Sequence, residues 1–265
     1  MLRSSIWRRI CSAVLVTLLY ASAHAQAPPR VVHVFVALAD NKYQGIVPVP
    51  AALGNGDDPG RNLYWGAGGG VKTFFAKSKE WELISTQKYP RPPILERCIF
   101  KHRTASVYMV ADAYQGAQIK QAITDFLDAA AGGPPLKIGF MSASNVVAFN
   151  AGGAADVIAY VGHDGLMDFQ LPKLPRNQNE NRREAIILAC ASKQYFTLAV
   201  RTAGASPLLW TTNLMAPEAY TLKAALDGWV AKESAEQIRQ RAAEAYAHYQ
   251  KCSVKAARGL LVTGW

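Results

Sequence analysis

The sequence predicts an α/β fold in which a mostly parallel β-sheet is flanked by helices. Half of the 265 residues are apolar, which is enough to bury a good core. Short continuous apolar runs recur along the chain and are typical of strands buried on both faces. Amphipathic segments alternate with these runs, as they do where helices connect parallel strands. No internal repeat or low-complexity tract interrupts this alternation.

Residues 1–25 are predicted to be a secretory signal peptide and not part of the fold. Its basic residues are Arg3, Arg8 and Arg9. An apolar run over 10–23 follows and is short for a membrane span, and Ala23-His24-Ala25 is a small-x-small cleavage site. The alternative is an uncleaved anchor. We expect a secreted or periplasmic protein with a single domain over 26–265 and no integral membrane segment after cleavage.

The first elements follow from residue types and spacing. Residues 31–40 (VVHVFVALAD) are apolar and β-branched, which predicts a buried strand. Residues 41–70 are rich in Gly, Pro, Asn and Asp and predict a long loop. Helical spacing of apolar residues predicts a helix over 71–84, and a second strand is expected at 105–114.

The later elements continue the alternation. A helix is predicted over 118–133, because its apolar residues share one face and glycines follow. The remaining predicted elements are a minor strand at 136–144, strands at 155–165 and 184–192, a helix at 193–204, a strand at 207–215 and two helices within 217–248.

Reactive side chains stand where predicted strands end. Asp40 ends the first strand, His163 ends VIAYVGH and Cys190 ends AIILAC. In parallel sheets the ligand site lies beyond the carboxyl ends of the strands. If the two later strands are neighbours, an imidazole and a thiol meet in one cleft. The alternatives are a small core cysteine and a structural histidine.

A histidine beside a cysteine is a pattern suited to acyl transfer. The imidazole takes the thiol proton, the thiolate attacks a carbonyl, and the imidazolium protonates the leaving amine. Backbone N–H groups in loops at strand ends can stabilise the oxyanion. No metal-binding motif such as HExxH or paired CxxC occurs, and we expect no metal and no cofactor.

The hydrophobic blocks before His163 and Cys190, IAYVGHDG and IILACAS, resemble those of the caspase-like cysteine peptidases. GHDG and ACASKQYF look closest to the gingipain-like members. The resemblance implies a caspase-like three-layer sandwich, a Cys190 nucleophile and a His163 general acid/base. It also implies an oxyanion hole from the backbone amides of Asp164, Gly165 and Cys190, and a protein or peptide substrate.

The chain departs from that family pattern at one position. The family has glycine directly after the histidine, whereas here Asp164 stands before Gly165. The Asp164 N–H can replace the glycine donor, but its carboxylate can crowd the site or raise the imidazole pKa. We expect this departure to affect activity more than it affects the fold.

Specificity follows less directly from the sequence. Peptidases of this class take a charged or polar P1 side chain, and a carboxylate in that pocket would select Arg or Lys. Asp40, Asp164 and Asp168 are the candidates, each with the alternative of an ordinary loop carboxylate. Trp210 and Thr211 are candidates for the substrate groove, the alternative being a core strand.

The net charge and the cysteines bear on the partners and the disulfide pairing of the protein. Without residues 1–25 the net charge is +7, from 26 basic and 19 acidic residues. No stripe of basic residues interleaved with aromatics occurs, so no nucleic-acid partner is expected. Cys11 leaves with the signal, and a Cys98–Cys252 disulfide with Cys190 free is the preferred pairing.

The sequence therefore predicts a secreted cysteine endopeptidase with a His163–Cys190 dyad. The alternative is a catalytically impaired protein of the caspase fold that acts as a binding or scaffold module in the cell envelope.

Overall fold

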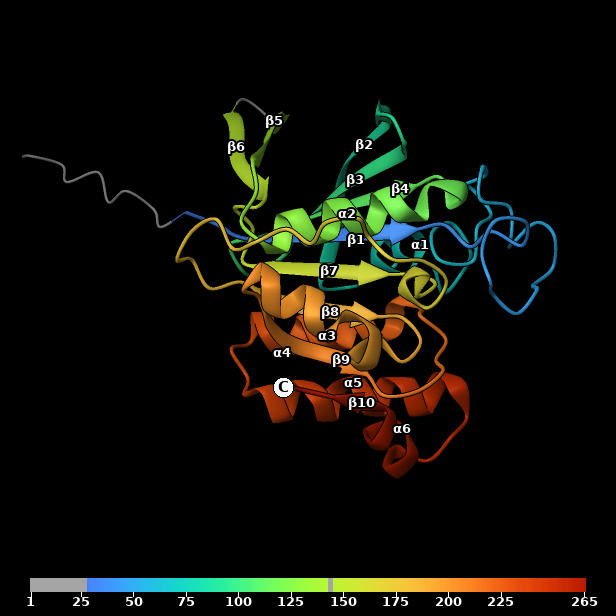
Figure 1. Cartoon of the computed structure of the whole chain (residues 1–265). Coiled ribbons are helices and arrows are strands. Elements are labelled where there is room, and N and C mark those ends of the chain that lie inside the picture. The colour runs from blue at the N-terminus through green and yellow to red at the C-terminus, as the bar shows by residue number, and fades with distance from the viewer. Residues whose placement is uncertain (1–27, 143–144) are drawn as a thin grey trace, which may run out of the picture.

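The centre of the protein is an eight-stranded sheet, as a computed structural model covering residues 28–142 and 145–265 describes it (Figure 1). In spatial order its strands are β10 (Leu261–Val262), β9 (Ser206–Thr211), β8 (Glu184–Leu188), β7 (Val157–Val161), β1 (Arg30–Ala37), β4 (Val107–Tyr114), β3 (Ile94–His102) and β2 (Trp81–Arg91). The five strands from β9 to β4 are parallel, and β10, β3 and β2 pair antiparallel with their neighbours. The predicted signal segment 1–25 lies outside the described residues.

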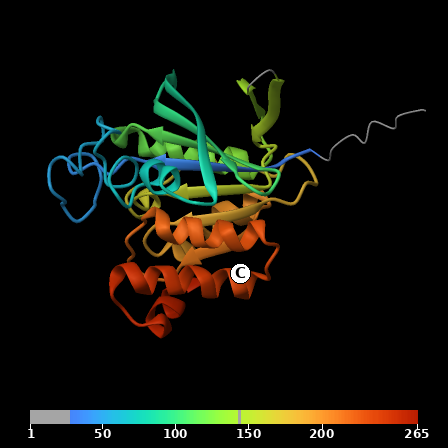
Figure 2. The same cartoon turned by 180° about the vertical axis from the view of Figure 1, so that it is seen from behind.

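Helices cover both faces of this sheet. They are α1 (Val71–Ala76), α2 (Ile119–Ala130), α3 (Ser192–Ala203), α4 (Ala219–Val230), α5 (Ala235–Gln250) and α6 (Val254–Leu260), with 3₁₀ turns η1 (Gly116–Gln118) and η2 (Gly165–Met167). Helices α2 and α3 lie on one face (Figure 1), and α4 and α5, orange to red, lie behind (Figure 2). The predicted α/β three-layer sandwich with a mostly parallel sheet is confirmed.

Strand β1 shows why the sheet needs helices on both sides. Val32 and Val34 pack into the core beneath α1, α4 and α5, whereas Val31 and Phe35 pack into the core beneath α2 and α3. Successive side chains of a strand point to opposite faces, so a continuous apolar run requires two apolar cores. The predicted strand at 31–40 is therefore a central strand, buried on both sides.

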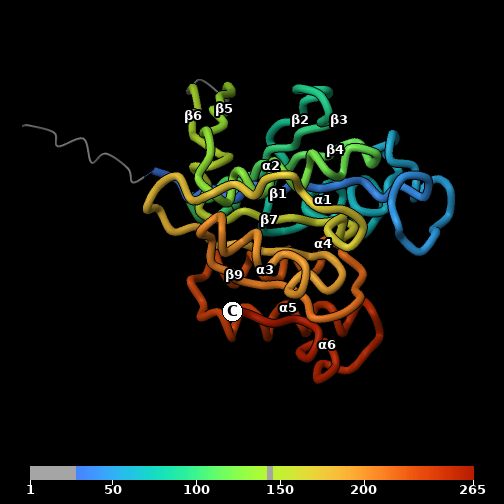
Figure 3. The backbone as a smooth tube through the Cα atoms, in the orientation of Figure 1, coloured from blue at the N-terminus to red at the C-terminus, as the bar shows by residue number. Residues whose placement is uncertain are grey.

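The strand order determines where a site can form. From β1 the chain crosses to the edge strand β2 and returns through β3 to β4 beside β1, and it then crosses β1 to form β7, β8 and β9 on the other side. The segments leaving β1 and β7 therefore turn to opposite faces, and a crevice opens between them at the carboxyl ends. Figure 3 shows the segment after β1 and the turn after β7 at the same end of the molecule. Several doubly wound α/β folds share this order, so it defines the architecture and not a family.

The predicted helix over 71–84 is wrong beyond Ala76. The Ser78 hydroxyl accepts the N–H groups of Glu80 and Trp81, which turns the chain out of the helix and into β2. The β2–β3 hairpin was not predicted, since the alternation of β2 is irregular and most of its residues are at least partly exposed. Its buried partner strand β3 supplies the edge on which β2 forms.

A second, two-stranded sheet projects from the body. The predicted minor strand at 136–144 is β5 (Pro135–Ser142), which pairs only with the unpredicted β6 (Asn145–Gly152). Figure 1 shows this hairpin standing away from the main sheet. Across residues 28–142 and 145–265, no helix is both long and apolar enough to cross a membrane.

Candidate active site

His163 and Cys190 leave the sheet side by side. Strands β7 and β8 are parallel neighbours with Val161 opposite Leu188, so the residues after each strand emerge at the same edge. The Gly162 N–H donates to the Leu188 carbonyl (3.2 Å) and continues the pairing up to the histidine. The two strands are thus neighbours, which is the condition for an imidazole and a thiol to meet in one cleft.

Glycine at position 162 lets the chain reach this edge. Gly162 has a φ of 152°, and a Cβ there would lie 2.9 Å from the Ala37 carbonyl oxygen at the end of β1. A larger residue would push β7 away from β1 and displace the histidine that follows.

The two reactive side chains line one cavity of about 340 Å³. Its other walls come from residues 45–49 and 63–64 of the loop after β1 and from residues 214–218 after β9. His163 is 8% exposed and Cys190 is half-buried. The cavity therefore lies at the crevice that the strand order creates, with walls from the segments that follow the parallel strands β1, β7, β8 and β9.

Asp168 holds the imidazole. Its Oδ2 lies 2.6 Å from His163 Nε2, and the η2 turn carries the carboxylate back to the ring. Because Nε2 faces Asp168, the other ring nitrogen, Nδ1, is the one left for proton exchange with the thiol. Asp168 was predicted as a substrate-selecting carboxylate. It does not line the cavity, and its described partner is the histidine.

Asp164 turns away from the cavity. Its side chain is fully buried, and Oδ1 accepts the Leu166 N–H (3.0 Å) at the start of η2. Its Oδ2 has no hydrogen-bond partner among the described residues. Burial, together with the nearby Asp168 charge, raises the pKa of Asp164 to about 7. The carboxylate that separates His163 from Gly165 therefore does not crowd the site.

The three predicted oxyanion donors differ in their availability. The Gly165 N–H donates to the His163 carbonyl (3.1 Å) and is already engaged. In the part of the chain that the structure describes, the N–H groups of Asp164 and Cys190 donate no hydrogen bond. These two N–H groups are therefore the unengaged donors beside His163 and Cys190 in the described residues.

The turn that carries Cys190 is tightly held. Ala191 adopts the left-handed conformation (φ 47°), and α3 starts at Ser192. The Cys190 Sγ donates to the Met215 carbonyl (3.6 Å) and accepts the Met215 N–H (3.4 Å). Among the described contacts the thiol and the imidazole do not hydrogen-bond each other, because the thiol contacts Met215 and the imidazole contacts Asp168.

Thr211 supports this turn and does not line the substrate groove. Its hydroxyl donates to the Ala189 carbonyl and accepts the Ser192 N–H (3.1 Å), and the residue is fully buried. Trp210 is also fully buried and packs edge-on against Trp265. Neither residue lines the cavity, so the alternative of a core strand is correct for both.

Asp40 organises the loop after β1. Its Oδ1 accepts the N–H groups of Lys42 (2.8 Å) and Tyr43 (3.1 Å), and its side chain is buried outside the cavity. The prediction that Asp40 selects substrate is therefore replaced by a role in loop structure.

The predicted Cys98–Cys252 disulfide is not formed in the structure. Cys98, Cys190 and Cys252 are all free thiols. Cys98 is buried in β3, where burial raises its pKa to about 12, and Cys252 is exposed after α5. A buried position within a sheet and an exposed helix end do not offer the close Cα approach that a disulfide needs.

Two cavity residues were missed by the sequence prediction. Tyr64 comes from the long loop and is 6% exposed, and Glu218 immediately precedes α4. Neither belongs to a motif, and only the folding of these loops onto the edge of β7 and β8 brings them to the cysteine. Among the described residues, no cluster of three or more His, Cys, Asp or Glu side chains forms a metal site.

Comparison of the chain with protein-family models, with curated proteins and with solved structures found no match.

Proposed function

We propose that this protein is a secreted cysteine endopeptidase related to the caspase-like peptidases. The observation that carries the proposal is the shared cavity, because neighbouring parallel strands deliver His163 and Cys190 to it. Residues 1–25 would direct the chain to the periplasm or the exterior.

In the proposed mechanism, His163 Nδ1 removes the Cys190 thiol proton as sulfur attacks the scissile carbonyl carbon. The carbonyl oxygen becomes an oxyanion that the free amides of Asp164 and Cys190 stabilise. Collapse of the intermediate breaks the C–N bond, and the imidazolium gives its proton to the leaving amine. Water then attacks the thioester, with the imidazole again as base, and releases the acid and the free thiol.

Asp168 acts in this scheme as a positioning residue. Its contact with Nε2 holds the ring orientation and stabilises the imidazolium that forms during attack. The partner at Nε2 also fixes which nitrogen carries the exchangeable proton.

A non-catalytic binding module is the second candidate. The contact between Cys190 Sγ and the Met215 backbone favours it, because a thiol held by a carbonyl and an amide is not paired with its base. A single labelling experiment separates the two candidates.

We expect a peptidyl acyloxymethyl ketone to label Cys190 in a Cys252→Ser background, which removes the exposed competing thiol. His163→Ala should slow labelling by about 100-fold or more, because general-base assistance is lost. Asp168→Asn should slow it by about 10-fold or more and shift its pH profile. Mass spectrometry of the labelled peptide measures each rate.

Cys190→Ala in the same background is the matched control and should abolish labelling, since Cys98 is buried. Equal labelling rates in wild type and His163→Ala would contradict the peptidase. An inert Cys190 in a folded protein would instead support the binding module.

A further inference from the structure

Glu218 brings an unpaired carboxylate to the cavity of His163 and Cys190. It immediately precedes α4, lines the cavity and is half-buried. Within residues 28–142 and 145–265, its side chain makes no hydrogen bond or ion pair. A carboxylate that has lost part of its hydration without gaining a partner is poised to take a cation from outside.

Gly69 leaves room for the Glu218 carboxylate. A Cβ on Gly69 would collide with the Glu218 carboxylate, and the Gly69 carbonyl accepts the Ala219 N–H (2.8 Å). The loop before α1 and the start of α4 are therefore fastened together around this side chain. The Glu218 position depends on two distant segments packing against each other.

Glu218 and Cys190 lie close to the same phenol. The pKa of Tyr64 is raised by burial and also by the charges of Cys190 and Glu218, so both groups act on one hydroxyl within the cavity. Burial also raises the pKa of Glu218, as expected for a carboxylate in apolar surroundings. The unpaired carboxylate and the Cys190 thiol line the same cavity as this hydroxyl.

The remaining walls are largely aliphatic. They include Ile46, Leu63 and Met215, with the more exposed Val47 (84%) and Leu214 (68%). A ligand that fits must combine an apolar stem with a cationic end, because the stem matches the walls and the end matches the carboxylate. Lysine and arginine side chains have this construction.

The carboxylates that the sequence predicted to select substrate are not placed to bind a cation in this cavity. Asp40 and Asp164 are buried away from the cavity, and Asp168 contacts the imidazole. Glu218 is the acidic residue that lines the cavity together with Cys190.

We propose that Glu218 is the specificity-determining residue of a pocket that accepts a lysine or arginine side chain at P1, so that cleavage follows basic residues. This inference rests on the proposed peptidase function. Glu218 pairs with the substrate cation, and the aliphatic walls pack against its stem while Cys190 attacks the adjoining carbonyl.

The test uses peptidyl acyloxymethyl ketones that differ only at P1, in the Cys252→Ser background. Lysine is compared with norleucine, which keeps the stem but lacks the charge, with arginine and with glutamate. We expect wild type to be labelled about 10- to 100-fold faster by the lysine and arginine probes than by norleucine. Only the two basic side chains can form a charged hydrogen bond with the Glu218 carboxylate. Glutamate should be slowest.

Glu218→Gln should reduce the lysine-to-norleucine rate ratio to near one, because the charge that distinguishes the two probes has lost its partner. Glu244→Gln, an exposed change on α5, is the matched control and should keep the wild-type ratio. Iodoacetamide, which has no P1 group, should alkylate Cys190 equally in wild type and Glu218→Gln.

The outcomes separate the inference from the function on which it rests. Fast labelling of wild type with no preference for lysine or arginine over norleucine overturns the Glu218 pocket and leaves the peptidase intact. A ratio that survives in Glu218→Gln also overturns it. Failure of every probe and of iodoacetamide at Cys190 in folded protein overturns both proposals.

Discussion

Asp164 is the residue at which the sequence departs from the family it resembles. The sequence alone predicts that its carboxylate either crowds the site or raises the imidazole pKa. In the structure it turns inward, caps η2 through Leu166 and leaves Oδ2 buried without a partner among the described residues. An aspartate at this position therefore lowers folding stability, and its N–H donates no hydrogen bond among the described residues.

This burial predicts a specific pH dependence of stability. The pKa of Asp164 is about 7 in the folded state, against an ordinary value of 3.8. Between these values the folded state binds the extra proton, so the free energy of unfolding falls as pH rises from about 4 to 7. The loss is about 4 kcal/mol at full extent.

Asp164→Asn removes that titration. We expect its urea-unfolding free energy to be nearly flat over this pH range relative to wild type, and higher than wild type above pH 7. Glu180→Gln, in an exposed loop, is the control and should keep the wild-type slope. Parallel pH curves for wild type and Asp164→Asn would contradict the assignment.

At the scale of elements, the turn between β8 and α3 decides whether the cysteine is presented. A non-glycine residue in the left-handed conformation at Ala191 costs roughly 1 kcal/mol, and surrounding contacts must hold it. Thr211 of β9 provides them by bonding Ala189 on one side of Cys190 and Ser192 on the other. Strand β9 thus supports the turn that carries Cys190.

Thr211→Val tests this support with nearly unchanged volume. The change leaves the buried Ser192 N–H and Ala189 carbonyl without this partner and should lower the unfolding free energy by about 1–3 kcal/mol. The labelling rate of Cys190 should also fall, measured below the unfolding transition. Thr212→Val removes an exposed hydrogen bond from the neighbouring hydroxyl to the Gly259 carbonyl and should change stability by no more than about 1 kcal/mol. Equal effects of the two changes would contradict the role of Thr211.

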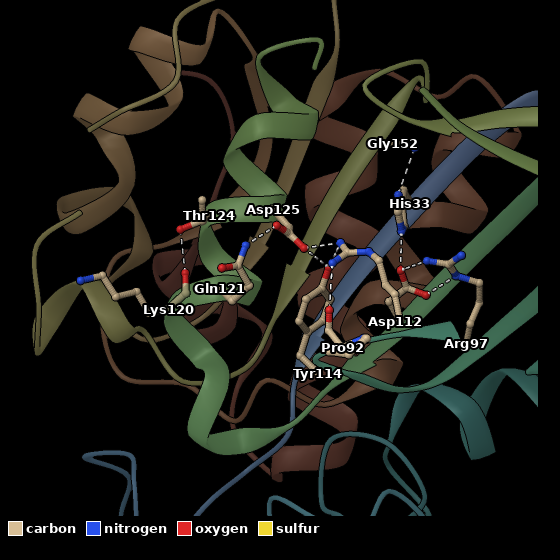
Figure 4. A network of polar contacts seen from close by, with 11 residues as sticks. His33, Pro92, Arg97, Asp112, Tyr114, Lys120, Gln121, Thr124, Asp125 and Gly152 are labelled. Atoms are coloured by element: carbon tan, nitrogen blue, oxygen red, sulfur yellow. Dashed lines mark hydrogen bonds and ion pairs between the residues drawn. The ribbon is translucent and has the colours of Figure 1, made fainter. Parts of the chain in front are cut away.

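At the scale of the whole molecule, a buried charge network ties the central strands together (Figure 4). Arg97 of β3 donates two hydrogen bonds to Asp112 of β4, at 2.6 and 2.7 Å, and His33 Nε2 of β1 lies 3.1 Å from the same carboxylate. The Gly152 N–H donates to His33 Nδ1, so the neutral ring carries its proton on Nε2 and donates to Asp112. One carboxylate therefore joins three strands, and β6 is connected through the histidine.

Replacing Asp112 should lower the free energy of unfolding. Asp112 is 1% exposed, and despite its burial the pKa is lowered by Arg97 and His33. Asp112→Asn leaves the Arg97 charge buried without a counter-ion and should reduce the unfolding free energy by about 3–5 kcal/mol, measured in urea at pH 7.

Glu82→Gln is the control for this prediction, because it breaks the exposed Arg103–Glu82 pair. Its effect should stay below about 1 kcal/mol. Comparable losses for the buried and the exposed pair would show that the Asp112 network does not hold the sheet together.

The predictable part of the fold consists of elements with a strong local signal. Continuous apolar runs such as 31–40 and 184–192 can only be buried on both faces, which requires helices above and below the sheet. The β2–β3 hairpin carried no such signal, because β2 is largely exposed and takes its structure from β3. Residues 77–80 leave the helix only because Ser78 bonds the amides that follow it.

The sequence by itself determined the α/β class and the emergence of His163 and Cys190 at strand ends, since apolar periodicity and strand termination are local properties. Tertiary structure decided the roles of the surrounding carboxylates. Asp168 turned to the imidazole, Asp164 turned inward, and Glu218 reached the cavity from another segment. The direction of a side chain after a strand depends on which loops pack against it, and those contacts join residues far apart in the chain.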